Sequence, residues 1–380
     1  MTTSRIFTLV GFCISFCLFS CNKAIQQLDQ EVSTPSQPPI QPPTPAQNII
    51  LLIGDGMGLT QMSTAYYYGE DTPSFSRFKY IGLHQNAPIG KKITDSASGA
   101  TAFSTGYKSF NSAIGVDKDS ISRETILEWA EKNQKSTGLI ATSSITHATP
   151  ASFYAHVDNR GLAEDIALDY TKLKIDFAAG GGYKYFNQRA DGRNLFNEMK
   201  SKGVEIDTNA IGNNFLPGNQ YAYFLAPDAM PKMLDGRGDF LTDATAAALK
   251  HLSTNDQGFF LMVEGSQIDW GGHNNDADYL ISELLDFDKA VDLALDFADK
   301  NENTLVIVTA DHETGGLSLS AAKVFGKDDY GALKATFSTG GHSAALIPVY
   351  AYGNGAEDFI GIYQNNELFF KMMRAFGVNR

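Results

Sequence analysis

Acidic and imidazole side chains occur at several separate places in the sequence, each beside a short apolar run or a pair of glycines. Carboxylate oxygens and imidazole nitrogens together form a ligand set that suits zinc and magnesium. If the chain brings these groups to one place, they predict metal-assisted chemistry. The side chains concerned are Asp55, Glu264, Asp269, His273, Asp311, His312 and His342.

Each of these fragments has a structural explanation when taken alone. Asp55, in Gly54–Gly58, is typical of an Asx-turn residue or a helix cap. Asp311 and His312 could form a hydrogen-bonded surface pair. Asp269 and His273 could be a capping carboxylate and a solvated imidazole, although a spacing of four also lets both reach one ion. A purely structural explanation weakens because four separate strand ends would deliver such groups.

A candidate nucleophile lies in the segment Thr94–Gly106, which is rich in small residues. The residues from Ala97 onward favour a helix that begins near Ser96, which would expose its hydroxyl to the free amides of the first turn. Ser96 could equally be a simple helix cap. An alcohol needs a base or a metal to attack at neutral pH, and the nearby carboxylates could hold such a metal.

Five short apolar runs predict buried strands, and the segments between them have helical spacing. The clearest predicted helices are 278–300 and 121–133. Alternating strands and helices predict an α/β fold with a mostly parallel central sheet and helices on both faces. In such a sheet, ligands bind beyond the carboxyl ends of the strands. We expect residues 183–239, whose periodicity is weak, to form an excursion from the sheet and not a separate domain. The predicted strands are 48–53, 138–141, 259–263, 304–309 and 346–352.

Composition narrows the class of protein further. The chain has 380 residues, of which 43% are hydrophobic and 19% are charged, as expected of a globular protein with a sizeable core. Its formal net charge of -13 argues against a nucleic-acid partner or an electrostatic grip on an anionic membrane. Its 3 cysteines, Cys13, Cys17 and Cys21, lie near the N-terminus, so no disulfide framework is expected in the folded part.

The N-terminal segment has the pattern of an exported lipoprotein. Residues 1–20 read as a signal peptide, and Ser20-Cys21 at its end resembles a lipobox in which the cysteine is acylated. An ordinary secretory signal with a chance cysteine is the alternative. Residues 21–47 then form a Pro- and Gln-rich tether, and 48–380 form the catalytic domain. We therefore expect export to the periplasm or the outer membrane, with a lipid anchor at Cys21.

The blocks around these residues resemble alkaline phosphatase in order and spacing from Asn48 to about Gly353. The resemblance rests on Asn48–Gly58, Thr94–Ala97, Val263–His273 and Thr309–His312. It implies hydrolysis of phosphate monoesters to an alcohol and inorganic phosphate through a phosphoserine on Ser96. It also implies a homodimer, which nothing in the sequence itself demonstrates.

The resemblance assigns three metal ions and a phosphate clamp. Asp269, His273 and His342 match the ligands of one zinc, and Asp55, Asp311 and His312 match those of the second. Asp55, Thr149 and Glu264 match the ligands of a third ion, usually magnesium. Arg160 matches the residue that binds the phosphate oxygens, a task suited to a planar guanidinium. Because all of these contacts go to the phosphoryl group, the substrate range should be broad.

Two positions depart from the pattern of the best-known bacterial forms. His147 stands where those forms have an aspartate, and Trp270 where they have a lysine. Together with Asp95, these residues are expected beside the metal ligands and the phosphate. A histidine should weaken magnesium binding at the third site. Loss of a lysine should weaken the binding of product phosphate.

Two other readings remain open. A phosphodiesterase or a metal-dependent mutase of the same superfamily shares the two-metal ligand set, but lacks Asp95-Ser96-Ala97 together with Arg160. A surface phosphate-binding or adhesion lipoprotein with a decayed site is the alternative from another class. Rates on a monoester and a diester, and the activity of a Ser96→Ala variant, would separate these readings.

Overall fold

The computed structural model describes residues 45–378. The predicted signal peptide, residues 1–20, lies outside the described residues, as does most of the predicted tether at 21–47. Among residues 45–378, no helix combines the length and the apolar character that a membrane span requires.

A ten-stranded, mostly parallel sheet forms the centre of the described chain, in the order β14-β2-β13-β8-β1-β7-β3-β4-β6-β5. The strand β13 runs antiparallel to both of its neighbours, β8 and β2. The sheet strands are β1 (Asn48–Gly54), β2 (Tyr80–Gln85), β3 (Ser136–Ser144), β4 (Phe177–Gly181), β5 (Val204–Asp207), β6 (Gln220–Ala226), β7 (Phe259–Gly265), β8 (Thr304–Thr309), β13 (Ile347–Gly353) and β14 (Gly361–Gln364). The predicted fold class is confirmed.

The three middle strands explain why the sheet is buried on both faces. β1, β7 and β8 are parallel and in register, with Ile49 beside both Phe260 and Leu305. Because side chains alternate along a strand, Ile49 and Leu51 enter one hydrophobic core, and Ile50 and Leu52 enter the other. Continuous apolar runs are therefore required in these strands.

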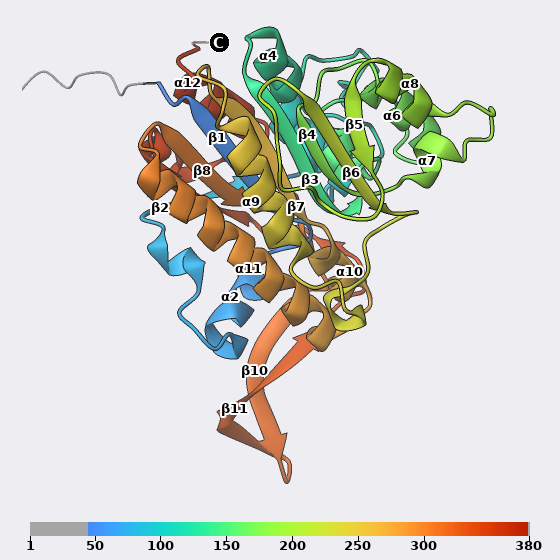
Figure 1. Ribbon diagram of the computed structural model, residues 1–380. Helices are drawn as coiled ribbons and strands as arrows, with labels where there is room; N and C mark the ends of the chain where they lie inside the picture. Colours follow the sequence, from blue (N-terminus) through green and yellow to red (C-terminus); the bar gives the residue numbers. More distant parts are fainter. Residues whose placement is uncertain (1–44, 379–380) are drawn as a thin grey trace, which may run out of the picture. The chain divides into compact units, whose positions relative to one another are not determined.

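Helices cover the two faces, as Figure 1 shows for α9 and α11 on the near side of the sheet. One core contains residues of α3, α4, α5, α6, α8 and α12, and the other contains residues of α2, α9, α10 and α11. The α-helices are α2 (Leu59–Tyr68), α3 (Ser96–Thr105), α4 (Ile126–Lys132), α5 (Ala148–Ala151), α6 (Ala163–Tyr170), α7 (Lys184–Asn187), α8 (Leu195–Ser201), α9 (Phe240–Leu252), α10 (Gln267–His273), α11 (Ala277–Lys300) and α12 (Glu367–Ala375).

The predicted excursion at 183–239 is wrong in part, because this segment supplies two strands of the sheet. β6 pairs with β4, and β5 pairs with β6 at the edge. The predicted helix at 121–133 begins later, at Ile126, where Thr125 and Glu128 form a capping box.

A second, smaller β structure lies between Asp311 and the last strands of the sheet. β9 (Glu313–Thr314) pairs with β12 (His342–Ser343). Between them, β10 (Leu317–Val324) and β11 (Lys327–Phe337) form an antiparallel hairpin that projects beyond α2 and α11 in Figure 1. Its side chains include the exposed Val324, Phe325, Tyr330 and Leu333.

Candidate active site

The predicted ligands gather at the carboxyl ends of the central strands. Asp55 follows β1, Glu264 lies near the end of β7, and Asp311 and His312 follow β8. The turn after β1 requires a glycine at Gly56, where φ is +74° and a Cβ would lie 2.7 Å from the Cα of Asp269. The backbone of β1 thereby approaches α10, the helix that carries Asp269.

Asp269, His273 and His342 form the first of three candidate metal-binding groups. His273 Nδ1 bonds the carbonyl oxygen of Gly340 at 2.8 Å, and His342 Nδ1 bonds that of Thr94 at 2.8 Å. Because a carbonyl can only accept, each Nδ1 carries the hydrogen, and each Nε2 presents a lone pair. The two Nε2 atoms lie 3.1 Å apart, and that of His273 is 3.4 Å from Asp269 Oδ1. Three electron-rich atoms this close fit a cation bound between them.

Asp55, Asp311 and His312 form the second group, next to the candidate nucleophile. His312 Nε2 lies 3.1 Å from Asp311 Oδ2, 3.5 Å from Asp55 Oδ1 and 3.3 Å from Ser96 Oγ. The backbone amides of Gly56 and His312 both donate to Asp311 Oδ1, which leaves Oδ2 facing the group.

Asp55, His147 and Glu264 form the third group, and Thr149 lies buried at the start of α5. Ser266 Oγ donates to Glu264 Oε2 at 2.5 Å. Within residues 45–378, both carboxylate oxygens of Asp55, the hydroxyl of Thr149 and Oε1 of Glu264 are buried without a hydrogen-bond partner. Buried polar atoms are normally satisfied, so these oxygens fit a bound cation.

The electrostatics of the metal-free side chains lead to the same conclusion. Burial, and then the charge of Asp311, raise the pKa of Asp55 well above its ordinary value. Burial raises the pKa of Glu264 to about 7, and it also raises the pKa of Asp311. Burial, and then His342, lower the pKa of His312 well below its ordinary value. Bound cations would reverse the penalty on the carboxylates and keep the imidazoles neutral.

Ser96 is the first residue of α3, as the small residues after it predict. Asp95, not Ser96, is the cap: its Oδ1 accepts a hydrogen bond from the backbone amide of Ser98 at 3.1 Å. The Ser96 hydroxyl is therefore not used for capping. Ser96 is 2% exposed, and its oxygen faces His312 across 3.3 Å.

Arg160 lies beside the same helix end. Its Nη1 is 3.3 Å from Asp95 Oδ2, and its Nη2 is 3.2 Å from His147 Nε2. Burial raises the pKa of Asp95, but hydrogen bonds from Ser98 and the charge of Arg160 outweigh it and leave the pKa below its ordinary value. Burial, and then Arg160, lower the pKa of His147 to about 3, so its ring is neutral and can accept from the guanidinium.

Trp270 packs its ring edge-to-face against His147, with the centroids 6.0 Å apart. The two positions that depart from the pattern of the best-known bacterial forms are therefore neighbours. Together, the structure brings all of the predicted metal ligands, Ser96, Arg160, Asp95, His147 and Trp270 to one end of the sheet.

Sequence reasoning missed Thr314, which connects the first two groups. Its hydroxyl donates to Asp269 Oδ1 at 2.6 Å. The same oxygen must then accept from His312 Nδ1, 3.1 Å away, which directs the lone pair of His312 Nε2 toward Asp55 and Asp311. Only the closeness of Thr314 to Asp311-His312 in the sequence could have signalled this role.

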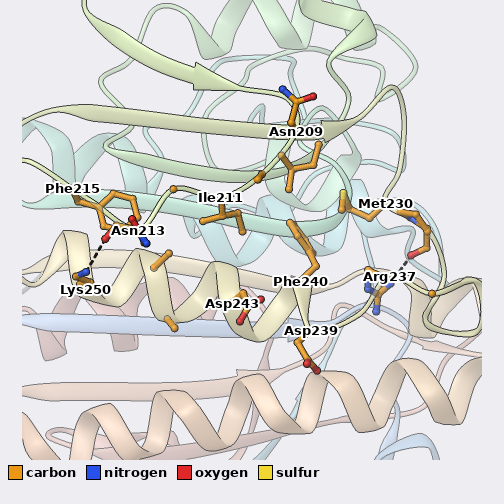
Figure 2. A pocket seen from close by; sticks show the side chains of 17 residues that line it. Asn209, Ile211, Asn213, Phe215, Met230, Arg237, Asp239, Phe240, Asp243 and Lys250 are labelled. Atoms are coloured by element: carbon orange, nitrogen blue, oxygen red, sulfur yellow. Dashed lines mark hydrogen bonds between the residues drawn. The ribbon is translucent and has the colours of Figure 1, made fainter.

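A cavity of 710 Å³ lies elsewhere, between the β5–β6 loop and α9 (Figure 2). Ile211, Phe215 and Phe240 line it, and Lys250 and Arg237 lie at opposite sides of the view. None of the predicted catalytic or metal-binding residues lines this cavity. The polar site at the strand ends and this cavity, which has both apolar and polar lining residues, are separate features.

Comparisons with known proteins identify relatives over most of the chain. The profile of the alkaline phosphatase family matches residues 46–336. Alkaline phosphatase 3 of Bacillus subtilis is 35% identical over 420 residues, covering 88% of this chain and 89% of the relative.

Comparison with solved structures also identifies alkaline phosphatases. An alkaline phosphatase from the Antarctic bacterium TAB5 is 52% identical, covers 90% of this chain and 100% of its own, and superposes with a TM-score of 0.87. A variant of that enzyme, with a histidine replaced by aspartate and with magnesium bound in a site called M3, is 52% identical over the same shares of the two chains and superposes with a TM-score of 0.86.

Proposed function

The chain belongs to the alkaline phosphatase family and hydrolyses phosphate monoesters, and from this premise we propose which of its residues perform the reaction. Ser96 is the nucleophile, and Arg160 binds the transferred phosphoryl group. Asp269, His273 and His342 would hold one zinc, and Asp55, Asp311 and His312 a second. Asp55, Thr149 and Glu264, with His147 beside them, would hold a third ion.

The observation that carries this proposal is the position of the Ser96 hydroxyl, 3.3 Å from His312 in a group of buried carboxylates. An alcohol there can attack only if nearby positive charge stabilises its alkoxide. Bound metal ions would supply this charge, and they would also stabilise the oxygen of the departing alcohol.

The side chains of the protein would divide the remaining work. Asp95 caps α3 and holds the Arg160 guanidinium, so that the free N–H groups of Arg160 can bind phosphoryl oxygens in a fixed plane. Ser96 Oγ attacks phosphorus opposite the ester oxygen, the alcohol leaves, and water then hydrolyses the phosphoserine. The alcohol part of the substrate has no assigned contact, which supports a broad substrate range.

The third site is where this chain should differ from the best-known bacterial forms. A histidine beside Asp55 and Glu264 adds a nitrogen to a site that would otherwise be built of oxygens. Magnesium prefers oxygen ligands, whereas zinc accepts imidazole. We therefore expect weak magnesium binding at this site and competition from zinc.

Trapping the intermediate tests the proposed nucleophile. Protein mixed with a phosphate monoester and quenched in acid should carry one acid-stable phosphate, which peptide mass spectrometry should locate on Ser96. Loss of this label in Ser96→Ala, and its retention in a variant of another α3 serine, Ser104→Ala, are expected. A phosphorylated residue other than Ser96 would overturn the assignment.

Export and lipid anchoring at Cys21 to a bacterial membrane, in the periplasm or at the outer membrane, are also part of the proposal. They are supported by the apolar segment that ends in Ser20-Cys21. Mass spectrometry of the mature N-terminus should find an acylated Cys21, and Cys21→Ala should release the protein from membranes. An unmodified N-terminus elsewhere in the chain would contradict this part.

We further propose a homodimer, as the family resemblance implies. The exposed Phe325, Tyr330 and Leu333 on the β10–β11 hairpin support a surface that a second copy covers. Light scattering on the purified protein should give twice the mass of the mature chain, and a monomeric mass at micromolar concentration would contradict it.

A further inference from the structure

The segment that carries Arg160 has little regular secondary structure of its own. After α5, its backbone is held to the loop before α4: Val157 and Ile114 exchange two hydrogen bonds, and the Arg160 amide donates to Ser112 at 2.8 Å. Two loops that hold each other do not by themselves fix a guanidinium relative to the sheet. Something must tie this pair of loops to the rigid elements.

Asp95, the cap of α3, and Thr101 of α3 bond the loop before α4, and His156 adds three further hydrogen bonds, two of which reach α4 and α6. Its backbone amide donates to Asp169 Oδ2 of α6 at 2.9 Å, and its ring contacts the Gly115 carbonyl at 2.7 Å and Glu128 Oε1 of α4 at 3.1 Å. Gly115 is at φ +60°, and a Cβ there would lie 2.8 Å from His156 Nδ1. The close approach of the ring therefore requires glycine at this position.

The partners of the ring define its protonation state. A carbonyl oxygen and a carboxylate can only accept, so both bonds are made only when both ring nitrogens carry hydrogen. Glu128 is itself held, because its other oxygen accepts from the backbone amide of Thr125 at 2.8 Å in the capping box of α4. His156 is thus an imidazolium, and it faces a carboxylate whose orientation is fixed by its bond from the Thr125 amide.

The charges around His156 come from α4 and α6. Glu128 and Asp169 face it, Lys132 on α4 lies beyond Glu128, and Lys172, two residues after the end of α6, pairs with Asp169. Burial lowers the pKa of His156, but the hydrogen bonds to Glu128 and Gly115 raise it above its ordinary value. Burial raises the pKa of Glu128, but the hydrogen bonds from His156 and the Thr125 amide and the nearby positive charges together outweigh burial and lower it.

We propose that His156, held between Glu128 and Gly115, is a positioning residue that fixes the Arg160 loop for phosphate binding. The proposal rests on the assigned role of Arg160. His156 touches neither substrate nor metal ligand; it acts by limiting how far the Arg160 backbone, four residues along the chain, can move. Deprotonation of the ring at high pH removes one of its two side-chain bonds and loosens the loop.

A double-mutant cycle on the metal-loaded enzyme tests this inference. His156→Gln should raise the inhibition constant of inorganic phosphate and the KM of a monoester by about tenfold, since small misplacements of a binding group are costly. In the Arg160→Ala background, the same change should alter both constants by less than about twofold, because residues that act through one another are not additive. The ratio between parent and His156→Gln should also shrink as pH rises.

The controls separate the possible failures. Glu128→Gln should reproduce the His156→Gln phenotype in weaker form, and it decides the question if His156→Gln does not fold. Glu131→Gln, on the same helix, should leave the phosphate inhibition constant unchanged. An Arg160→Ala variant with normal phosphate affinity would overturn the role of Arg160. A His156 effect of equal size in both backgrounds, or no effect in either, would overturn this inference alone.

Discussion

Two clusters of buried carboxylates, at separate places in the chain, differ in where their compensating charge comes from. Glu283 and Asp286 on α11 bind Arg237, with the guanidinium Nη2 at 2.5 Å and 2.8 Å from the two carboxylates. These three side chains are at most 1% exposed. At the strand ends, Asp55 and Asp311 are equally buried, yet no arginine or lysine of residues 45–378 forms an ion pair with either.

The difference shows what each cluster is for. Arg237 supplies one permanent positive charge to its two partners and ties the segment before α9 to α11, so that cluster is a structural joint, although burial still raises the pKa of both Glu283 and Asp286. The carboxylates at the strand ends likewise have raised pKa values, but among residues 45–378 both oxygens of Asp55 and Oδ2 of Asp311 have no hydrogen-bond partner, and no arginine or lysine pairs with either residue. Their negative charge must be balanced by cations that bind from solution. A bound cation with an open coordination position is also what catalysis needs.

Removal of the bound metal ions should have the largest effect on activity. We expect dialysis against a chelator to lower the monoester hydrolysis rate by at least about 10³-fold, because the ions supply several kcal/mol of transition-state stabilisation. Added zinc should restore the rate. Elemental analysis alongside the assay checks this, and full activity in protein without detectable metal would contradict it.

Ser96→Ala should have the next largest effect. We expect kcat to fall by about 10³-fold or more, as for other nucleophile removals. The zinc content and the melting temperature should change little, because the hydroxyl caps no helix. Steady-state kinetics and elemental analysis check both parts. A variant that loses zinc in step with activity would instead make Ser96 a structural residue of the site.

Arg237→Met should act on stability and not on chemistry. Removing one partner of a buried ion pair costs about 3–5 kcal/mol of unfolding free energy, because it leaves the carboxylates unpaired. Urea unfolding measures this loss. A triple variant that also carries Glu283→Gln and Asp286→Leu should recover most of it, and Arg193→Met, at an exposed ion pair, should change the free energy of unfolding much less. A fall in kcat in an Arg237→Met variant that still folds would mean that the Arg237 cluster contributes to the reaction as well as to stability.

The pH dependence of stability should distinguish the metal-free from the metal-loaded protein. Burial raises the pKa of Glu264 to about 7 from 4.5, so without metal the folded state binds this proton more tightly than the unfolded state. The stabilisation is complete below pH 4.5 and is lost as pH rises through about 7.

Unfolding of the chelated protein in urea should therefore show lower stability at pH 8 than at pH 5, and Glu264→Gln should reduce that difference. In the zinc- and magnesium-loaded protein, the carboxylate is already ionised and this loss should disappear. A chelated protein that gains stability between these two pH values would contradict the sign derived for Glu264.

Trp270→Lys should give the smallest effect. A lysine beside His147 adds positive charge near the phosphate, so we expect the inhibition constant of inorganic phosphate to fall by about three- to tenfold. If product release limits turnover, kcat should fall with it. Trp270→Phe, which adds no charge, is the matched control, and an equal change in both variants would make the effect one of ring packing.

The sequence predicted the parts of the fold whose signal is local. The continuous apolar runs of β1, β7 and β8 and the long helical period of α11 lie where expected. The edge strand β5 was missed because it has only 4 residues, two of them acidic. β6 was missed with it, because its apolar residues lie between loops without clear periodicity. Short edge strands are defined by the neighbour they pair with, which the sequence alone does not reveal.

The residues of the site also divide into those that the sequence reveals and those that it does not. Asp55, Asp311 and His342 could be found because ligand residues follow apolar runs or paired glycines. Thr314 and His156 could not, because their partners are defined by tertiary contacts: Thr314 reaches Asp269 from a different element, and His156 reaches Glu128 across two loops. Residues that orient others leave little mark on the local sequence.

The short β9–β12 pair marks a position where the length of the intervening chain can vary without disturbing the site. His342 lies opposite Thr314, and Ser343 opposite Glu313, so the two ends of the projecting hairpin are fixed at its root, beside the ligands. Chain added to or removed from the far end of such a ribbon changes closure entropy only slowly with length. Relatives could therefore exchange short ribbons for whole modules at this position while the ligand spacing stays the same, and an engineer could graft a recognition element there.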